Sequence, residues 1–287
     1  MPLGLSETGT DWAQLERLVL GWSETSHQPA ISEHSRLKLR ENDGVVLADR
    51  NRSAVVTMVP TREAGHELVE IAVSPGVEIA AVWEEARGRI LALARARGNR
   101  SVDVITAMTR LADRLAAEGF RRERAVVRGN LTEPRSEPRV LHHEFRRFRR
   151  GTEDEGDLLQ LVQLTMAGHP DNVGWESSDL KARLEQPWFD GEGFFLAGEA
   201  GALIGYCWTK VHQDGVGEIY LVGVHPAHTG RGLGGDLVAR GVEHLLATRN
   251  SHRVIAYWDD DHPPAANLYR SAGFRIDRVD EFYRLLL

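Results

Sequence analysis

The sequence of 287 residues contains very little cysteine, very little lysine and no long apolar run. Its one cysteine, Cys207, excludes an internal disulfide and is typical of the reducing cytoplasm, where we expect the protein to be. No apolar stretch approaches the roughly twenty residues of a membrane helix, and no secretory signal pattern opens the chain. We therefore expect no membrane partner.

Positive charge is also scarce. The 42 Asp and Glu residues outnumber the 35 Lys and Arg residues, which leaves a net charge of −7. This balance argues against a nucleic-acid partner and slightly favours a cationic or amine substrate. Only Lys38, Lys181 and Lys210 are lysines, so a lysine marks a position where arginine was not suitable.

The most distinctive stretch runs from Glu218 to Gly235, with the sequence EIYLVGVHPAHTGRGLGG. It predicts a strand, a turn at Pro226, a glycine-rich loop and the beginning of a helix. Backbone N–H groups at such a helix N-terminus point toward a bound phosphate, and the helix dipole favours its negative charge. A glycine-rich loop alone is weak evidence, because most such loops are turns.

Two segments of the first half recur in the second half at nearly constant spacing. Ala117–Arg121 (AEGFR) returns as Ser271–Arg275 (SAGFR) 154 positions later, and Ile71–Pro75 aligns with Val222–Pro226 151 positions later. The order of the predicted elements between these segments also repeats. The sequence therefore predicts two copies of one α/β unit.

The length suits two domains, which we place at residues 1–131 and 142–287, with a linker at 132–141 that contains two prolines. Hydrophobic periodicity predicts the main elements of both copies. We expect helices near residues 11–21, 32–41, 77–97, 109–118, 157–166 and 178–184, and strands near 45–49, 54–59, 68–73, 102–106, 121–128, 145–150, 194–198 and 203–211.

The glycine-rich loop and a second motif resemble the GNAT acetyltransferase superfamily, whose R/Q-x-x-G-x-G/A loop holds the pyrophosphate of acetyl-CoA. Here Thr229 replaces the first Arg or Gln, which removes one side chain and keeps the backbone cradle. The second motif, Asn267–Phe274, has Asn267 two residues before Tyr269 instead of four. The resemblance implies a mixed α/β sheet flanked by helices in each of two tandem domains, with acetyl-CoA as co-substrate and no metal.

Within that superfamily, the segments AGHPDNVGW, WFD, YCWTKVH and GEIYLVGV resemble the mycothiol synthases, a family with two such units. The likeness is close in the C-terminal half and covers the N-terminal half only in layout. It implies acetyl transfer to the cysteinyl amine of desacetylmycothiol, a cysteine–glucosamine–inositol conjugate, and we expect a monomer. An acetyltransferase for another small amine, such as an aminoglycoside or a peptide N-terminus, and a non-catalytic acetyl-CoA-binding module are the alternatives.

The two copies differ where acetyl-CoA would bind. In place of the glycine-rich loop the first copy has Gly76–Ala81 (GVEIAA), whose β-branched residues would crowd a phosphate. Leu115 occupies the position of Tyr269 and cannot donate a proton. We therefore expect the catalytic site in the second domain, although the first copy could still hold a CoA unproductively.

Amide formation from a thioester needs a base for the amine and an acid for the leaving thiolate. The resemblance implies that Glu218 is the general base, acting directly or through water; a solvated carboxylate at the strand end is the alternative. It likewise implies that the Tyr269 hydroxyl is the general acid, whereas a packed ring with its hydroxyl at the surface is the alternative.

The resemblance also implies binding residues. Gly223 would let the ligand approach closely or mark a bulge. The acetyl-CoA residues would be Val222, Gly223, Val224, Thr229, Gly230, Arg231, Gly232, Leu233, Gly234, Gly235, His262 and Asn267. The acceptor, in a cleft between the domains, would contact Glu33, Asp171, Lys210, Glu218 and Tyr257. Lys210 is the most informative of these, whereas Glu33 could equally be a solvated helix carboxylate.

Three other features are weaker candidates for functional sites. Asp259–His262 (DDDH) is better explained as an acidic strand-to-helix loop than as a metal site, because no second cluster stands at ligand spacing. His225 and His228 flank the turn and are expected at the surface. Cys207 lies in an alternating strand pattern and is expected to pack rather than to act as a nucleophile.

Overall fold

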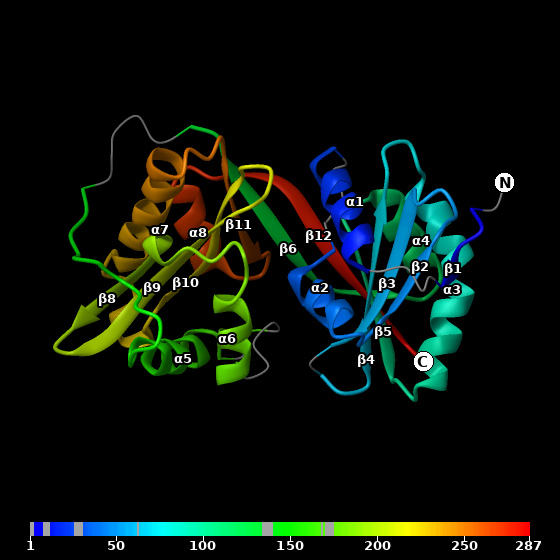
Figure 1. The fold of residues 1–287 in the computed structure, drawn as a ribbon, viewed down its shortest axis with the longest axis horizontal. Helices are drawn as coiled ribbons and strands as arrows, with labels where there is room; N and C mark the ends of the chain where they lie inside the picture. The colour runs from blue at the N-terminus through cyan, green and yellow to red at the C-terminus, as the bar shows by residue number, and fades with distance from the viewer. Residues whose placement is uncertain are drawn as a thin grey trace. The chain divides into compact units, whose positions relative to one another are not determined.

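The computed structural model describes residues 3–7, 12–25, 31–61, 63–133, 140–167, 169 and 175–287, and the chain divides into two compact units. The first unit comprises Met1–Val126 and Arg278–Leu287, and the second comprises Val127–Asp277. The last residues of the chain thus belong to the first unit. The predicted domains were the contiguous ranges 1–131 and 142–287, and these boundaries stay predictions. Figure 1 shows the path of the chain through the helices and strands of each unit.

The first unit is a mixed sheet with helices on both faces. Its sheet has the order β1-β2-β3-β4-β5-β12, in which the β4–β5 pair is parallel and the others are antiparallel. Its elements are β1 (Ser6–Glu7), α1 (Trp12–Thr25), α2 (Glu33–Arg40), β2 (Val45–Ala48), β3 (Ala54–Pro60), β4 (His66–Val73), α3 (Ile79–Ala96), β5 (Ser101–Thr106), α4 (Thr109–Ala117), the beginning of β6 (Arg121–Leu131) and most of β12 (Arg275–Leu286).

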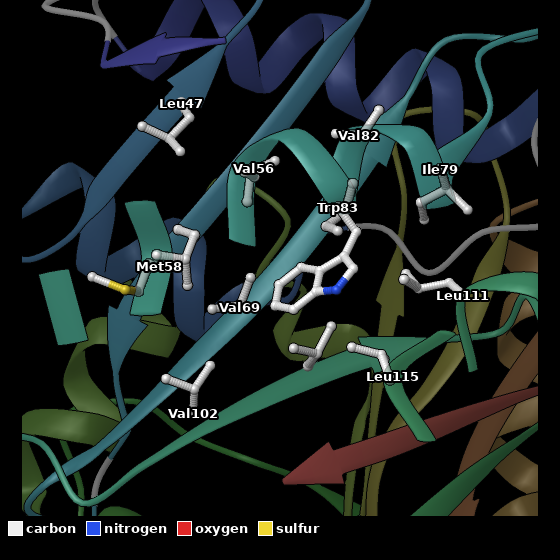
Figure 2. Close-up of a cluster of buried hydrophobic side chains, with 14 of the residues drawn as sticks. Leu47, Val56, Met58, Val69, Ile79, Val82, Trp83, Val102, Leu111 and Leu115 are labelled. Atoms are coloured by element: carbon white, nitrogen blue, oxygen red, sulfur yellow. The ribbon is translucent and has the colours of Figure 1, made fainter. Parts of the chain in front are cut away.

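Alternation along β3 supplies both cores of this unit, because successive strand residues point to opposite faces. Val56 and Met58 join the cluster of α3 and α4, whereas Val55 and Val59 join that of α1 and α2. In Figure 2 the indole of Trp83, from α3, lies among the side chains of the first cluster. The sheet is therefore buried on both faces, as in an α/β fold.

The second unit repeats this plan. Its sheet has the order β6-β11-β10-β9-β8-β7, with β10–β11 parallel and β7–β8, β8–β9 and β9–β10 antiparallel. Its elements are the end of β6, β7 (Arg146–Arg147), α5 (Asp154–Thr165), α6 (Ser177–Leu184), η1 (Gly191–Gly193), β8 (Phe194–Glu199), β9 (Ala202–Val211), β10 (Gly217–Val224), η2 (Pro226–His228), α7 (Leu233–Glu243), a π-helical turn η3 (His244–Thr248), β11 (Val254–Asp259) and α8 (Pro263–Ser271).

The element order confirms the internal repeat, because β4-α3-β5-α4-β6 returns as β10-α7-β11-α8-β12. Pairing, however, exchanges the last strand of each copy. In the first unit β12, from the second copy, pairs with β5, and in the second unit β6 lies beside β11. The exchange explains why the last residues of the chain belong to the first unit.

Strand β9 separates two cores in the second unit. Tyr206 and Trp208 pack with α5 and α6, whereas Cys207 packs on the other face with α7 and α8. Burial raises the pKa of the Cys207 thiol to about 12, so the thiol stays protonated. The prediction that Cys207 is a packing residue is confirmed. Across the described ranges, no helix is long and apolar enough to cross a bilayer.

Candidate active site

Strand β10 has two neighbours at its beginning and one at its end. Gly217, Glu218 and Ile219 pair with β11, whereas pairing with β9 continues as far as Val224. In this fully described segment the β11 ladder ends at Ile219, and a bulge between Ile219 and Leu221 interrupts the β9 register. The later part of β10 therefore offers backbone groups to which an extended ligand can add as a strand.

The glycine-rich loop follows β10 and leads directly into α7. Gly230 and Gly232 have φ angles of +75° and +86°, a region that other residues rarely adopt. The first helical bond runs from the Asp236 N–H to the Gly232 carbonyl, so the N–H groups just before it are among those without an internal helical partner. These groups and the helix dipole suit a pyrophosphate.

Thr229 closes the turn that precedes this loop. Its Oγ1 donates to the Pro226 carbonyl at 2.9 Å. The His225 ring accepts the Ala227 N–H, and His228 lies 3.1 Å from a Glu199 carboxylate oxygen. Both histidines are only half-buried. The side chain at position 229 thus shapes the turn, and the role of the loop backbone in binding an anion stays a prediction.

Packing against Tyr206 requires a glycine at position 223. A Cβ atom there would lie 2.5 Å from the Tyr206 ring and hydroxyl, since the two residues are register partners. The Tyr206 hydroxyl in turn lies 2.8 Å from Thr165 Oγ1. The bulge of β10 is located at Tyr220, so Gly223 makes room for Tyr206 and does not mark the bulge.

Glu218 lies near the beginning of β10 and is buried, with 8% of its surface exposed. Its Oε2 lies 2.6 Å from Nε2 of His212, and Lys210 is its register partner on β9. His212 was not singled out from the sequence. Its spacing of two residues from Lys210, which places both side chains on one face of the hairpin, is the signal that could have found it.

Lys210 is a buried cation with 5% of its surface exposed. Its Nζ lies 4.4 Å from the Trp188 ring centroid and 5.0 Å from that of Tyr220. Arg183 Nε donates to the Tyr220 hydroxyl at 3.0 Å. Aromatic faces attract such a cation, so these rings fix where the ammonium lies. Trp188, Tyr220 and Arg183 were likewise not found from the sequence.

Tyr269 lies on α8 with 4% of its surface exposed. Its ring stacks on Trp258 at a centroid distance of 5.1 Å and meets the edge of Phe274 at 5.4 Å. Burial raises the pKa of the Tyr269 phenol far above its usual value, and the Glu218 charge adds to the effect. The phenol is therefore protonated at neutral pH, as a proton donor must be.

Residues 158–274 match the model of the acetyltransferase (GNAT) family, a span that includes β10, the glycine-rich loop and Tyr269. A mycothiol acetyltransferase of Thermomonospora curvata is 34% identical over 98% of this chain and 97% of its own length. The chain belongs to the mycothiol acetyltransferase family.

Other relatives agree with this family. A mycothiol acetyltransferase of Thermobispora bispora is 39% identical over 69% of this chain and 70% of its own. A GNAT acetyltransferase structure from Sphaerobacter thermophilus has a TM-score of 0.74 at 19% identity, covering 98% of this chain and 95% of that one. A tandem GNAT protein from the clavulanic acid biosynthesis pathway has a TM-score of 0.70 at 17% identity, covering 98% of both.

These matches confirm two predictions from the sequence, the mycothiol acetyltransferase family and the fold of two tandem GNAT units. The chain is an acetyl-CoA-dependent N-acetyltransferase. The GNAT match lies within the second unit, which also contains Glu218, Lys210 and Tyr269. At the position of Tyr269 in the first unit, Leu115 is fully buried in the apolar core.

The remaining residues that were predicted to bind acetyl-CoA or the acceptor are spread more widely. His262 and Asn267 are exposed, and Asn267 lies two residues from Tyr269, which puts the two side chains on different sides of α8. Tyr257 is half-buried on β11, and Glu33 begins α2 of the first unit. Asp171 lies outside the described residues. The binding roles of all these residues stay predictions.

The acidic loop after β11 packs locally. His169 Nε2 lies 2.7 Å from an oxygen of Asp259, which is buried. Asp260, Asp261 and His262 are exposed. In the part of the chain that the structure describes, no group of three or more His, Cys, Asp and Glu residues could hold a metal ion.

Proposed function

We propose that the chain transfers the acetyl group of acetyl-CoA to the cysteinyl amine of desacetylmycothiol, with mycothiol and CoA as products. The observation that carries the proposal is the similarity over nearly the whole chain to a relative named mycothiol acetyltransferase. The proposed acetyl-CoA site consists of the later part of β10 and the loop that begins α7. The proposed acceptor residues are Lys210, Tyr257, Asp171 and Glu33, together with Glu218.

The proposed base is the Glu218 carboxylate. A primary α-amine has an ordinary pKa near 8, so near neutral pH much of it carries a proton that must leave before attack on the thioester. Glu218 accepts that proton, and the neutral amine then forms the new C–N bond. Lys210 lies directly opposite Glu218 on β9 as its register partner.

The proposed acid is the Tyr269 hydroxyl. Collapse of the tetrahedral intermediate breaks the C–S bond and leaves a thiolate, to which Tyr269 donates its proton. The phenol is protonated at neutral pH, and its raised pKa extends the protonated form to more alkaline pH. Glu218 and Tyr269 thus move protons at the two ends of one transfer, without an acyl-enzyme.

Replacement of Glu218 tests the proposal. Glu218→Gln keeps the size of the side chain and removes its basicity, so kcat for acetylation of desacetylmycothiol should fall by about a hundredfold. Acetyl-CoA affinity, measured by calorimetry, should stay within about twofold, because the cradle is backbone. Glu243→Gln, at an exposed position on α7 paired with Arg240, is the matched control and should leave kcat unchanged. Undiminished turnover in Glu218→Gln would rule out the base.

A further inference from the structure

The hairpin that joins β9 to β10 brings a histidine against the proposed base. His212 Nε2 lies 2.6 Å from Glu218 Oε2, a distance typical of a strong hydrogen bond that involves an ionised group. The side chain of Glu218 is 11% exposed and that of His212 is 31% exposed. The imidazole is therefore more exposed to solvent than the carboxylate that it contacts.

The backbone of the hairpin fixes where this imidazole lies. The His212 N–H donates to the Val216 carbonyl at 2.8 Å, and the His212 carbonyl accepts the Gly215 N–H at 3.0 Å. Asp214 Oδ1 accepts the Val216 N–H at 3.0 Å, which closes the turn further. With both backbone groups of His212 engaged, its side chain is held at the end of β9, on the same face as Lys210.

Hydrogen-bond chemistry assigns the direction of the contact. An ionised carboxylate only accepts, so His212 Nε2 must carry the proton and donate it toward Oε2. We propose that His212 is a positioning residue that holds the Glu218 carboxylate through Oε2 in the orientation in which the carboxylate takes the proton from the acceptor amine. This inference rests on the proposed role of Glu218 as the base.

Other charged groups also act on this carboxylate. Lys210 is its partner across the strands, and Tyr269 interacts with it electrostatically from α8. In the hairpin and beside it lie Asp214 and the ring of His252, which is near Gly215. None of these groups changes in a substitution of His212, so a change in the titration of Glu218 would report the lost donor.

The test compares two side chains of nearly equal shape. His212→Gln places an amide N–H near the position of Nε2, whereas His212→Met fills the same space without a donor. A donor to the charged form lowers the pKa of a carboxyl group, so its removal should raise it. We expect the acidic limb of the kcat–pH profile to move up by about one pH unit in His212→Met and to stay in place in His212→Gln.

The outcomes separate this inference from the proposed function. An unmoved limb in His212→Met, or an equal shift in His212→Gln, would overturn the positioning role while leaving Glu218 as the base. If Glu218→Gln retains full turnover, the base itself is wrong, whatever the His212 variants show. In the Glu218→Gln background, His212→Met should cause no further loss of kcat, because the carboxylate that it holds is absent. We expect the KM for acetyl-CoA to be unchanged in each variant, which would show that the variant is folded.

Discussion

The residues proposed for catalysis in the second unit are held in place by packing. Tyr269 stacks on Trp258 and is buried. The ring therefore packs as the alternative interpretation expected, but the hydroxyl is not at the surface as that interpretation held, and the acid role stays a proposal. A residue whose ring is fixed by its neighbours is also well placed to donate a proton with little loss of entropy.

The pH dependence of turnover tests Tyr269. Because burial raises the pKa of its phenol, the protonated form persists above pH 10, the usual tyrosine value, and kcat should not decline near that pH. Tyr269→Phe should keep the packing and lower kcat by about a hundredfold. A decline centred at or below pH 10 that disappears in Tyr269→Phe would contradict the raised pKa. Unchanged turnover in Tyr269→Phe would exclude the acid.

Among single residues, the sequence indicated those that lie in motifs. It missed those whose neighbours are set by the pairing of strands. Glu218 and Lys210 were both named, but their position opposite each other depends on the register of β9 and β10. His212 lies in no motif and becomes visible only when the hairpin closes. Gly223 was predicted to contact the ligand, whereas the structure shows that Tyr206, on the neighbouring strand, leaves no room for a side chain there.

At the scale of elements, the beginning of α7 is the feature on which acetyl-CoA binding is proposed to depend. The conformation of the loop needs glycine at Gly232, where φ is +86°. Gly234 lies inside the helix, and a Cβ there would meet Leu268 and Val224 at 3.6 Å, an ordinary contact. The backbone conformation therefore requires glycine at position 232, whereas position 234 has room for a Cβ atom.

Alanine substitutions at these two positions should distinguish the effect of backbone conformation from the effect of an added side chain. Gly232→Ala forces a side chain into the left-handed region, at a cost of about 1–2 kcal/mol, and should weaken acetyl-CoA binding by about tenfold. Gly234→Ala should bind within about twofold of the parent chain, since its Cβ makes ordinary contacts. Calorimetry with acetyl-CoA measures both. Equal affinities would show that the loop conformation does not shape the cradle.

Most elements were predictable because their apolar periodicity is strong. The hairpin β2–β3 and the long helix α3 are confirmed within a few residues, and Gly119 ends α4 with a φ of +90°. The strand expected at 145–150 is wrong in length, because only Arg146 and Arg147 pair with β8. Arg146 also makes two hydrogen bonds to Asp154, both at 2.7 Å, a contact that no strand periodicity reveals.

At the scale of the whole molecule, the repeat was visible and the exchange of its last strands was not. β6 and β12 occupy equivalent places in the two copies, so the sequence pattern allows either strand to pair with β5 or with β11. The pairing of β12 with β5, from Glu281–Thr106 to Leu286–Ser101, depends on contacts between distant segments. Arg284 adds two hydrogen bonds to Asp103, at 2.7 and 2.8 Å.

Removal of the C-terminal segment should therefore affect the first unit. Deletion of residues 278–287 leaves β5 without its β12 partner and Asp103 without Arg284, so hydrogen exchange of the β5 amides should accelerate strongly. The amides shared by β8 and β9 should change much less, because their pairing lies within the second unit. Protection of β5 that survives the deletion would contradict this division of the chain.

The central claim is the identity of the acceptor. Purified protein should be incubated with acetyl-CoA and one amine in each reaction. The amines are desacetylmycothiol, an aminoglycoside, a peptide with a free N-terminus and glucosamine, and mass spectrometry follows the products. We predict that mycothiol forms with a kcat/KM at least about a hundredfold above that of any other amine. No acetylated desacetylmycothiol, or a clear preference for another amine in the panel, would contradict the account.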